Sequence, residues 1–589
     1  MNDFFHSRRF LVLLAILWAV SLAAVLLLWL PNAGLSARFK QYIPVPVQAA
    51  QPSGHGSYDY SVPMGTALLN LNEDFYPLAQ LYEDGQPLGP GGSLHADIGT
   101  LGDGRFSLWN DGYLYFSASD NSDPRTNGRQ YTLVLPNFTL IGRYYTLIAW
   151  SLALLLPIPL FLGFRYFPNV DMGKNQKIYT LSFIILVGFA LAVGFHYYYS
   201  FYLNRPYPYT TFLFPPEPHF EDYYSLLRNS HTLNPYWEFN HSQYPFLVIL
   251  GNLLSLIPGR SYIFYILIVS SLFLLFSILN LRGERWHTNA MPIFIVTFLT
   301  YPFLFSVDRG NFESLLCIFL LAFLFFYNKK QYLVSTIFLS LAISMKIYPA
   351  ILLILFIPER KYREIAVCLV TTVAITLASL MCFRGGLLHN LNFLLQGSNI
   401  SSNSYFAQWM SINSNWVQRG VSLLTFFKIF YFETGLLPAF IRSSFSSIYM
   451  ILAAMMGLLV FLYVIFVEKE IWKRVTLLTF SMLLLPPISA DYKLLHVFIP
   501  LYLLLNTKNS QKFDVLYLLM FGLLLIPKDF HYFSTVISEG GHDISTSVVI
   551  NIFTMIVMSA LIMTSGTKDW IANIRKATRP VGNTPPRHP

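Results

Sequence analysis

The chain alternates between long apolar runs and short polar segments over most of its length. The first apolar run, residues 10–30, directly follows Arg8 and Arg9, and from residue 143 onwards such runs alternate with charged segments almost to the end. About 20 consecutive apolar residues suffice to cross a bilayer as a helix. The pattern predicts a polytopic α-helical membrane protein with about 14 transmembrane helices, counted to within about two because several runs are short.

The predicted spans after the first are 143–163, 178–200, 262–281, 291–306, 312–327, 331–346, 348–357, 365–383, 446–467, 475–490, 494–506, 513–527 and 545–564. The segment 243–257 is short and bounded by prolines, so we expect it to lie at the membrane interface without crossing. With the N-terminus inside, clusters such as Lys329/Lys330 and Arg360/Lys361/Arg363 fall on the cytoplasmic side, as the positive-inside rule requires.

Residues 31–142 interrupt the apolar pattern and are rich in Gly, Pro, Asn and Asp. Residues 105–109 and 113–117 flank Asn110-Asp111-Gly112, which predicts a β-hairpin because Asp-Gly supplies the positive φ of a tight turn. A further strand is predicted over 131–135. The division that follows is an anchor (1–30), an extracytoplasmic β domain (31–142), a transmembrane module (143–567) and a basic cytoplasmic tail (568–589).

Composition supports the membrane assignment, with 54% hydrophobic and only 12% charged residues. The net charge of +9 is distributed in short clusters between apolar runs, which indicates topology and argues against a nucleic-acid partner. All three cysteines lie in apolar segments, so no disulfide framework is expected.

Ionisable groups near lipid are costly without a partner, so polar groups between apolar runs are candidates for chemistry. On the predicted topology, several such groups share the outer face, and their convergence is typical of an active site. They are Glu217, His219, Glu221 and Asp222; Asp308, Arg309, Asn311 and Glu313; Lys346 and Tyr348; and Asp491, Lys493 and His496.

Each group also has a structural interpretation. Asp222 suits the N-cap of a helix beginning at Tyr223, Asp308 and Arg309 suit an adjacent ion pair, and Lys346 suits snorkelling from an apolar run. Residues 491–493 suit a polar turn, and Trp409 suits a membrane anchor rather than a sugar platform. No spacing suggests a metal site, because Asp120-Asn121-Ser122-Asp123 lacks the rest of a calcium loop and predicts a turn.

Residues 178–506 resemble the polyprenyl-phosphate-sugar-dependent glycosyltransferases of the GT-C superfamily, and above all the family 87 mannosyltransferase-like proteins. The resemblance rests on the outer acidic loop, on Tyr244-Pro245, on Asp308-Arg309-Gly310-Asn311, and on Lys346-Ile347-Tyr348-Pro349. The extra anchor and β domain, and the spacing of Glu-Asp-Tyr-Tyr in the acidic loop, depart from the family pattern.

The resemblance implies transfer of one sugar from a polyprenyl-phosphate donor to a glycan or lipid acceptor, with inversion, without metal or cofactor, on the outer side of an inner membrane. It implies that Asp222, or else Glu221, is the general base. A phosphate leaving group requires fixed cations, for which Arg309, Lys346 and Lys493 are candidates. His219, Tyr244, Asp308, Asn311, Tyr348, Trp409, Asp491 and His496 are candidates for substrate contacts.

Two other functions remain open from the sequence. A secondary transporter or lipid flippase would move substrate without a covalent product. A polysaccharide polymerase or ligase would use a lipid-diphosphate oligosaccharide as donor.

Overall fold

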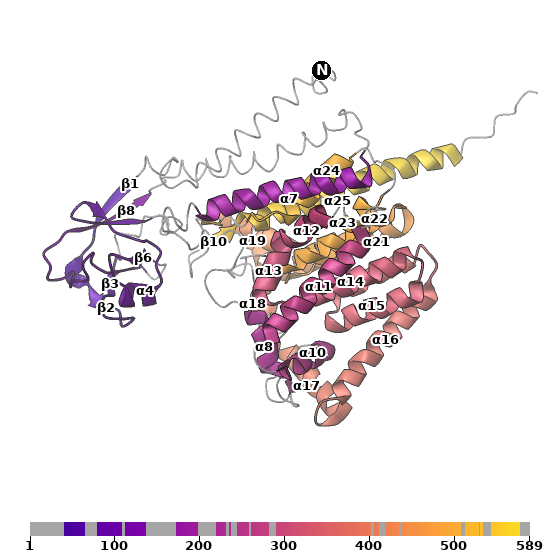
Figure 1. Cartoon of the computed structure of the whole chain (residues 1–589), viewed down its shortest axis with the longest axis horizontal. Helices are drawn as coiled ribbons and strands as arrows, with labels where there is room; N and C mark the ends of the chain where they lie inside the picture. Colours follow the sequence, from indigo (N-terminus) through magenta and orange to yellow (C-terminus); the bar gives the residue numbers. More distant parts are fainter. Residues whose placement is uncertain are drawn as a thin grey trace, which may run out of the picture.

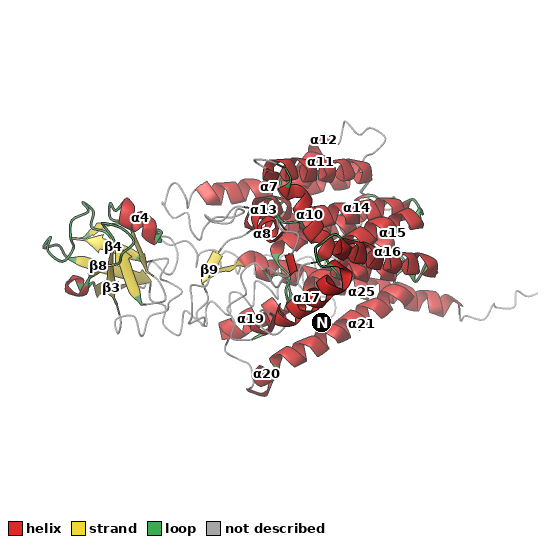
Figure 2. Cartoon of the chain, turned by 90° about the horizontal axis from the view of Figure 1, so that it is seen from below, coloured by secondary structure: helices red, strands yellow, loops and turns green. Residues whose placement is uncertain are grey.

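The computed structural model has an N-terminal β domain and a larger helical module (Figures 1 and 2). It describes residues 40–64, 79–108, 112–136, 172–197, 220–230, 235–236, 244–257, 261–281, 290–401, 406–411, 420–434, 439–507, 513–528, 531–533 and 543–577. The predicted anchor, the span 143–163 and most of the tail lie outside these residues.

Two four-stranded sheets form the β domain. One has the order β1-β8-β4-β5 and the other β2-β3-β7-β6. The apolar side chains that alternate along these strands meet in one core, which includes Ile43, Val62, Leu81, Phe116 and Leu133. The elements are β1 (Lys40–Pro44), η2 (Val47–Ala49), β2 (Gln51–Pro52), β3 (Tyr60–Pro63), β4 (Gln80–Glu83), β5 (Gln86–Pro87), α4 (His95–Thr100), β6 (Phe106–Leu108), β7 (Tyr113–Phe116) and β8 (Tyr131–Pro136).

The predicted hairpin is confirmed as the antiparallel pair β6–β7, in which Phe106 pairs with Phe116 and Leu108 with Leu114. The predicted strand over 131–135 is also present as β8, but it belongs to the other sheet, between β1 and β4. That pairing joins residues far apart in the sequence, and local turn signals carry no information about it.

A polar network ties β4 to the end of β8. Arg129 Nη1 lies 3.1 Å from Glu83 Oε1, and the Tyr131 hydroxyl donates to the same oxygen over 2.6 Å. Burial raises the pKa of Glu83, but the hydrogen bonds from Ser119, Tyr131 and Arg129 outweigh it and hold the pKa below its usual value. The predicted turn near Asp120 is confirmed, and Asp120 pairs there with Arg129 at 2.5 Å.

Among the described residues, five helices are long and apolar enough to cross a membrane. They are α7 (Lys174–Tyr197), α11 (Ser261–Leu281), α16 (Tyr362–Met381), α21 (Phe445–Phe466) and α25 (Thr546–Ala577), the last over Ser547–Lys568. A sixth span is formed if α12 (Ala290–Phe298) and α13 (Tyr301–Arg309), which are bent by 55°, count as one. The described residues therefore show a helical membrane protein and do not confirm fourteen crossings.

Several predicted spans form shorter helices. The segment 348–357 is largely a 3₁₀ helix, and 494–506 is divided between a 3₁₀ helix and a short α-helix. The shorter elements are α8 (Glu221–Ser230), α10 (Pro245–Ser255), α14 (Glu313–Asn328), α15 (Tyr332–Met345), η7 (Tyr348–Phe356), α17 (Gly386–Ser401), α18 (Ala407–Met410), α19 (Leu423–Thr434), α20 (Ala439–Ser443), α22 (Ile471–Leu484), η9 (Asp491–Val497), α23 (Phe498–Leu505), α24 (Asp514–Leu525), β9 (His531–Phe533) and β10 (Asp543–Ser545).

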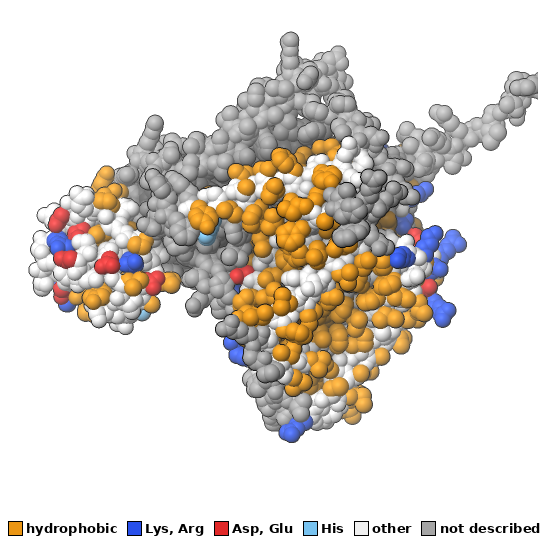
Figure 3. Space-filling model, viewed as in Figure 1, with side chains coloured by type: hydrophobic (Ala, Val, Ile, Leu, Met, Phe, Trp, Pro, Cys, Tyr) orange, Lys and Arg blue, Asp and Glu red, His pale blue; other side chains and the backbone are white. Residues whose placement is uncertain are grey.

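The surface of the helical module separates apolar from basic residues. Exposed apolar side chains cover the outward faces of α7, α11 and α16, among them Leu191, Leu267 and Val370 (Figure 3). Lys and Arg side chains gather at the end where α14 meets α15, including the exposed Lys329 and Lys330. An apolar belt with a basic end is the arrangement expected of a membrane-embedded helical protein.

Candidate functional site

The junction between α8 and α13 places the acidic loop against the end of a broken span. The backbone N–H of Phe220 donates to the Asp308 carbonyl over 2.8 Å. Gly310 ends α13 with φ of 62°, and a Cβ there would lie 2.7 Å from the Tyr223 Cβ. Only glycine combines this left-handed backbone with so close an approach. The junction therefore brings Asp222 to Arg309.

Asp222 is held by two side chains from this junction. Arg309 Nη2 lies 2.7 Å from Oδ1, and Asn311 Nδ2 donates to Oδ2, also over 2.7 Å. Asn311 Oδ1 accepts the backbone N–H of Glu313 over 2.9 Å. Since α8 begins at Glu221, and since Asp222 bonds to Arg309 and Asn311, the expectation that Asp222 caps a helix starting at Tyr223 is wrong.

Glu313 is the centre of a second group of polar side chains, and its backbone N–H bond to Asn311 links this group to the first one. Its side chain is fully buried at the start of α14, and it bonds to three partners from different elements. Lys346 Nζ lies 2.6 Å from Oε1, and His496 Nε2 lies 3.0 Å from Oε2, which also accepts the Tyr348 hydroxyl. Lys346 therefore forms an ion pair with the buried Glu313, and its own side chain is half-buried.

Lys493 lies at the edge of the same group. Its Nζ donates to the Ile488 carbonyl over 2.9 Å and sits 4.9 Å from the centre of the Tyr348 ring. Within the described residues, no carboxylate lies within 4 Å of this ammonium group, although Glu313 is within electrostatic range. Residues 491–493 begin the 3₁₀ helix η9 rather than forming a simple turn.

The two groups together contain three cations and two carboxylates. Arg309 faces Asp222, Lys346 faces Glu313, and Lys493 has the contacts given above. Cations held in place in this way suit an anionic group such as a phosphodiester.

Glu221 is the neighbouring carboxylate, and it has a different environment. It pairs with Arg228 at 2.5 Å, and the Arg228 side chain is 63% exposed. An exposed pair of this kind contributes little energy and no fixed geometry. The structure therefore distinguishes the two carboxylates that the sequence left as alternatives.

The remaining candidates differ in their positions and contacts. Asp491 is buried and accepts hydrogen bonds from Tyr301 and Ser547 at 3.1 and 3.2 Å, so it joins α13 to α25. Trp409 donates to the Pro487 carbonyl over 2.9 Å, and Tyr244 stands directly before α10. Asp308 is buried beside Arg309. Glu217 and His219 lie outside the described residues.

The sequence interpretation gave Glu313 too little weight. It named this residue beside Asn311 but left it out of the candidate site residues, although it lies at the centre of the charged group. A carboxylate at the start of a sixteen-residue apolar helix is itself a signal, because such a group needs a partner in the membrane.

No group of three or more His, Cys, Asp or Glu side chains with a metal-binding arrangement occurs in the described part of the chain. Both carboxylates near the junction are instead bonded to Arg, Lys, Asn, Tyr or His. A carboxylate beside fixed cationic groups can accept a proton, and the cations can stabilise negative charge.

Comparison with known proteins gives one match, to the model of glycosyltransferase family 87 over residues 244–487. Comparisons with curated proteins and with solved structures found no match. The matched segment includes Arg309, Asn311, Glu313 and Lys346, and it begins after Asp222 and ends before Lys493. The resemblance to family 87 is thus confirmed over residues 244–487.

Proposed function

We propose that the protein transfers a single sugar from a polyprenyl-phosphate donor to a glycan or lipid acceptor on the outer side of the membrane. The proposed reaction inverts the anomeric carbon, uses Asp222 as general base, and needs no metal or cofactor. The observation that carries it is the placement of Asp222 against Arg309 and Asn311, directly beside the buried group around Glu313.

The acceptor hydroxyl must lose its proton as its oxygen attacks the anomeric carbon, so a carboxylate has to lie within hydrogen-bond reach. Arg309 and Asn311 occupy one oxygen each of Asp222 and fix the plane of the carboxylate. Each carboxylate oxygen has a second lone pair, which is available to the acceptor hydroxyl. Fixing the base in this way reduces the entropy lost on reaching the transition state.

The phosphate oxygen of the donor leaves as the bond to the sugar breaks, and negative charge accumulates on it. Lys493 is the first candidate to meet this charge, because its described contacts are a carbonyl and a ring. Lys346 and Arg309 are positioned by Glu313 and Asp222 and can contribute further positive charge. Fixed cations of this kind stabilise a developing anion without reorganisation.

A panel of labelled donors tests this function. Purified protein in lipid discs is incubated with acceptor extract and with polyprenyl-phosphate, polyprenyl-diphosphate or nucleotide sugars. We expect label to move only from a polyprenyl-phosphate sugar, with the opposite anomeric configuration in the product. Transfer from nucleotide sugars alone, or of whole oligosaccharides from a diphosphate, would contradict the proposed donor. Movement of lipid across vesicles without covalent product would indicate a flippase.

A further inference from the structure

Four aromatic rings gather at one surface of the β domain, far along the chain from the charged groups described above. Tyr113 and Tyr115 share one face of β7, because alternate residues of a strand point the same way, and their ring centres are 6.3 Å apart. His95 of α4 stacks on Tyr115 at 3.9 Å, and His55 lies 4.9 Å from His95. We call these four residues the ring cluster.

The loop that carries His55 packs closely against α4, which carries His95. The loop that carries His55 touches α4, and the Tyr58 N–H donates to the Gly99 carbonyl over 3.2 Å. A Cβ on Gly56 would lie 2.3 Å from the Gly99 backbone, and one on Gly99 would lie 2.4 Å from the His55 carbonyl oxygen. Two glycines facing each other therefore allow His55 and His95 to meet, and any larger residue would separate them.

Polar groups lie directly against the rings. His55 Nδ1 is 3.2 Å from Asp59 Oδ2, which leaves the other ring nitrogen for a further partner. Ser107 is paired with Tyr115 in the strand register and is 2% exposed. Among the described residues, the Ser107 hydroxyl and the second oxygen of the buried Asp59 have no hydrogen-bond partner. Unpartnered buried polar groups are uncommon and require an explanation.

The ring cluster is only partly explained by the packing of the domain. Leu114 and Phe116 alternate with the two tyrosines and face the core, whereas Tyr113 is 40% exposed and the His55 side chain 46%. Rings that fill a core are not this exposed. Partly exposed rings combined with a few fixed polar groups are typical of ligand sites, where the rings supply contact area and the polar groups fix orientation.

We propose that the ring cluster binds carbohydrate, with the exposed tyrosine ring against the apolar face of a sugar and His55 bonded to its hydroxyl groups. A sugar hydroxyl both donates and accepts, so it can bond to an imidazole nitrogen in either tautomer. The nearby Asp59 carboxylate already faces His55, so the rings and their hydrogen-bonding groups suit an uncharged glycan. On the transferase function proposed above, and resting on it, the bound glycan is the acceptor.

The test is binding of full-length protein in lipid discs to an array of uncharged oligosaccharides built from hexoses and pentoses. Tyr113→Ala and His55→Ala should each weaken binding by roughly tenfold, as expected when one ring contact is lost. Tyr113→Phe should keep most of the affinity because it keeps the ring. Tyr42→Ala is the matched control, since Tyr42 is a 67% exposed tyrosine in the other sheet, and it should bind normally.

Absence of array binding by the wild-type protein would overturn the inference, as would equal losses in Tyr42→Ala and Tyr113→Ala. Binding to protein-free phospholipid vesicles that is lost in Tyr113→Ala would assign the cluster to the membrane surface and would also overturn it. Asp222→Asn should bind the array normally while losing transfer. This variant separates the two proposals, because glycan binding is measured in a protein that does not transfer sugar. Failure of glycan binding in the wild type would leave the transferase proposal untouched.

Discussion

Glu313 shows at the scale of single residues how a charge is kept in the middle of an apolar module. Its two oxygens receive Lys346, Tyr348 and His496, and its backbone N–H is bonded to Asn311. Lys346 and Tyr348 come from one short segment, whereas His496 comes from a distant part of the chain. Burying the carboxylate is costly, and only the full set of partners offsets that cost.

Removing only Glu313 or only Lys346 should therefore destabilise the protein more than removing both charges together. We expect Glu313→Gln and Lys346→Met each to destabilise the protein by about 3–5 kcal/mol, because each leaves a buried charge without its partner. The double variant should recover much of that loss. Apparent melting temperatures in detergent for the wild type, both single variants and the double variant form a double-mutant cycle. Strictly additive shifts would show that the two charges do not interact.

At the scale of elements, the site depends on where α12 and α13 end. The span over 290–309 breaks between α12 and α13, so that α13 ends with Arg309 beside the acidic loop. The signal for this break is present in the sequence, since Pro302 stands in the first turn of α13 and lacks the N–H that a continuous helix would bond back to the end of α12. Apolar periodicity alone cannot show it, because both halves of the broken span are apolar.

Gly310→Ala tests the junction. The substitution places a Cβ 2.7 Å from the Tyr223 Cβ on a backbone with φ of 62°, so we expect α8 to shift and transfer to fall by at least tenfold. The matched control is Gly386→Ala, which has φ of 74° but no atom within 4 Å of the new Cβ. It carries the same backbone strain without the clash. Equal losses in the two variants would show that strain, and not the α8 contact, is responsible.

Sequence patterns predicted some element ends and missed others. Tyr244-Pro245 opens α10 as expected, whereas the predicted span 291–306 is divided into α12 and α13, and α13 continues to Arg309 with Gly310 as its left-handed cap. They did not predict that Glu313 would gather Lys346 and His496, because these residues are 33 and 183 positions away in the chain. Contacts over such separations depend on how the helices pack, which local periodicity does not encode.

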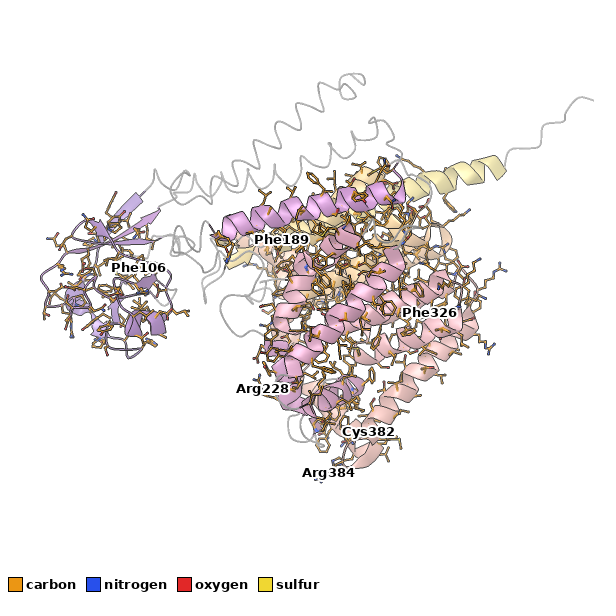
Figure 4. All side chains as sticks on the ribbon, in the orientation of Figure 1. Phe106, Phe189, Arg228, Phe326, Cys382 and Arg384 are labelled. Carbon is orange, nitrogen blue, oxygen red and sulfur yellow. The ribbon has the colours of Figure 1, made fainter. Side chains whose placement is uncertain are left out.

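At the scale of the whole molecule, the ends of the helices differ in charge and contact. Figure 4 places Arg228 of α8 at the opposite end of the helical module from Phe326 of α14. The exposed Lys329 and Lys330 lie three and four residues after Phe326. In the topology that we propose from the positive-inside rule, this basic end lies in the cytoplasm and the site lies on the outer side.

Labelling from one side of the membrane tests this orientation. We expect Arg228→Cys to react with an impermeant maleimide added to intact spheroplasts, and Lys329→Cys to react only after permeabilisation. Both substitutions should be made with Cys382→Ser, because Cys382 is the exposed native cysteine, while Cys317 and Cys368 are buried. Equal labelling of both positions in intact spheroplasts would contradict the proposed topology.

The central claim is that Asp222 acts as the base, and sugar transfer by Asp222→Asn measures it most directly. The substitution keeps the shape of the side chain and removes its proton affinity, so transfer by the folded protein should fall by roughly 10²–10⁴-fold. Glu221→Gln, which alters the neighbouring exposed pair, should stay within about fivefold of the wild type. Near-normal transfer by Asp222→Asn would contradict the account, whereas loss of transfer in Glu221→Gln alone would assign the base to Glu221.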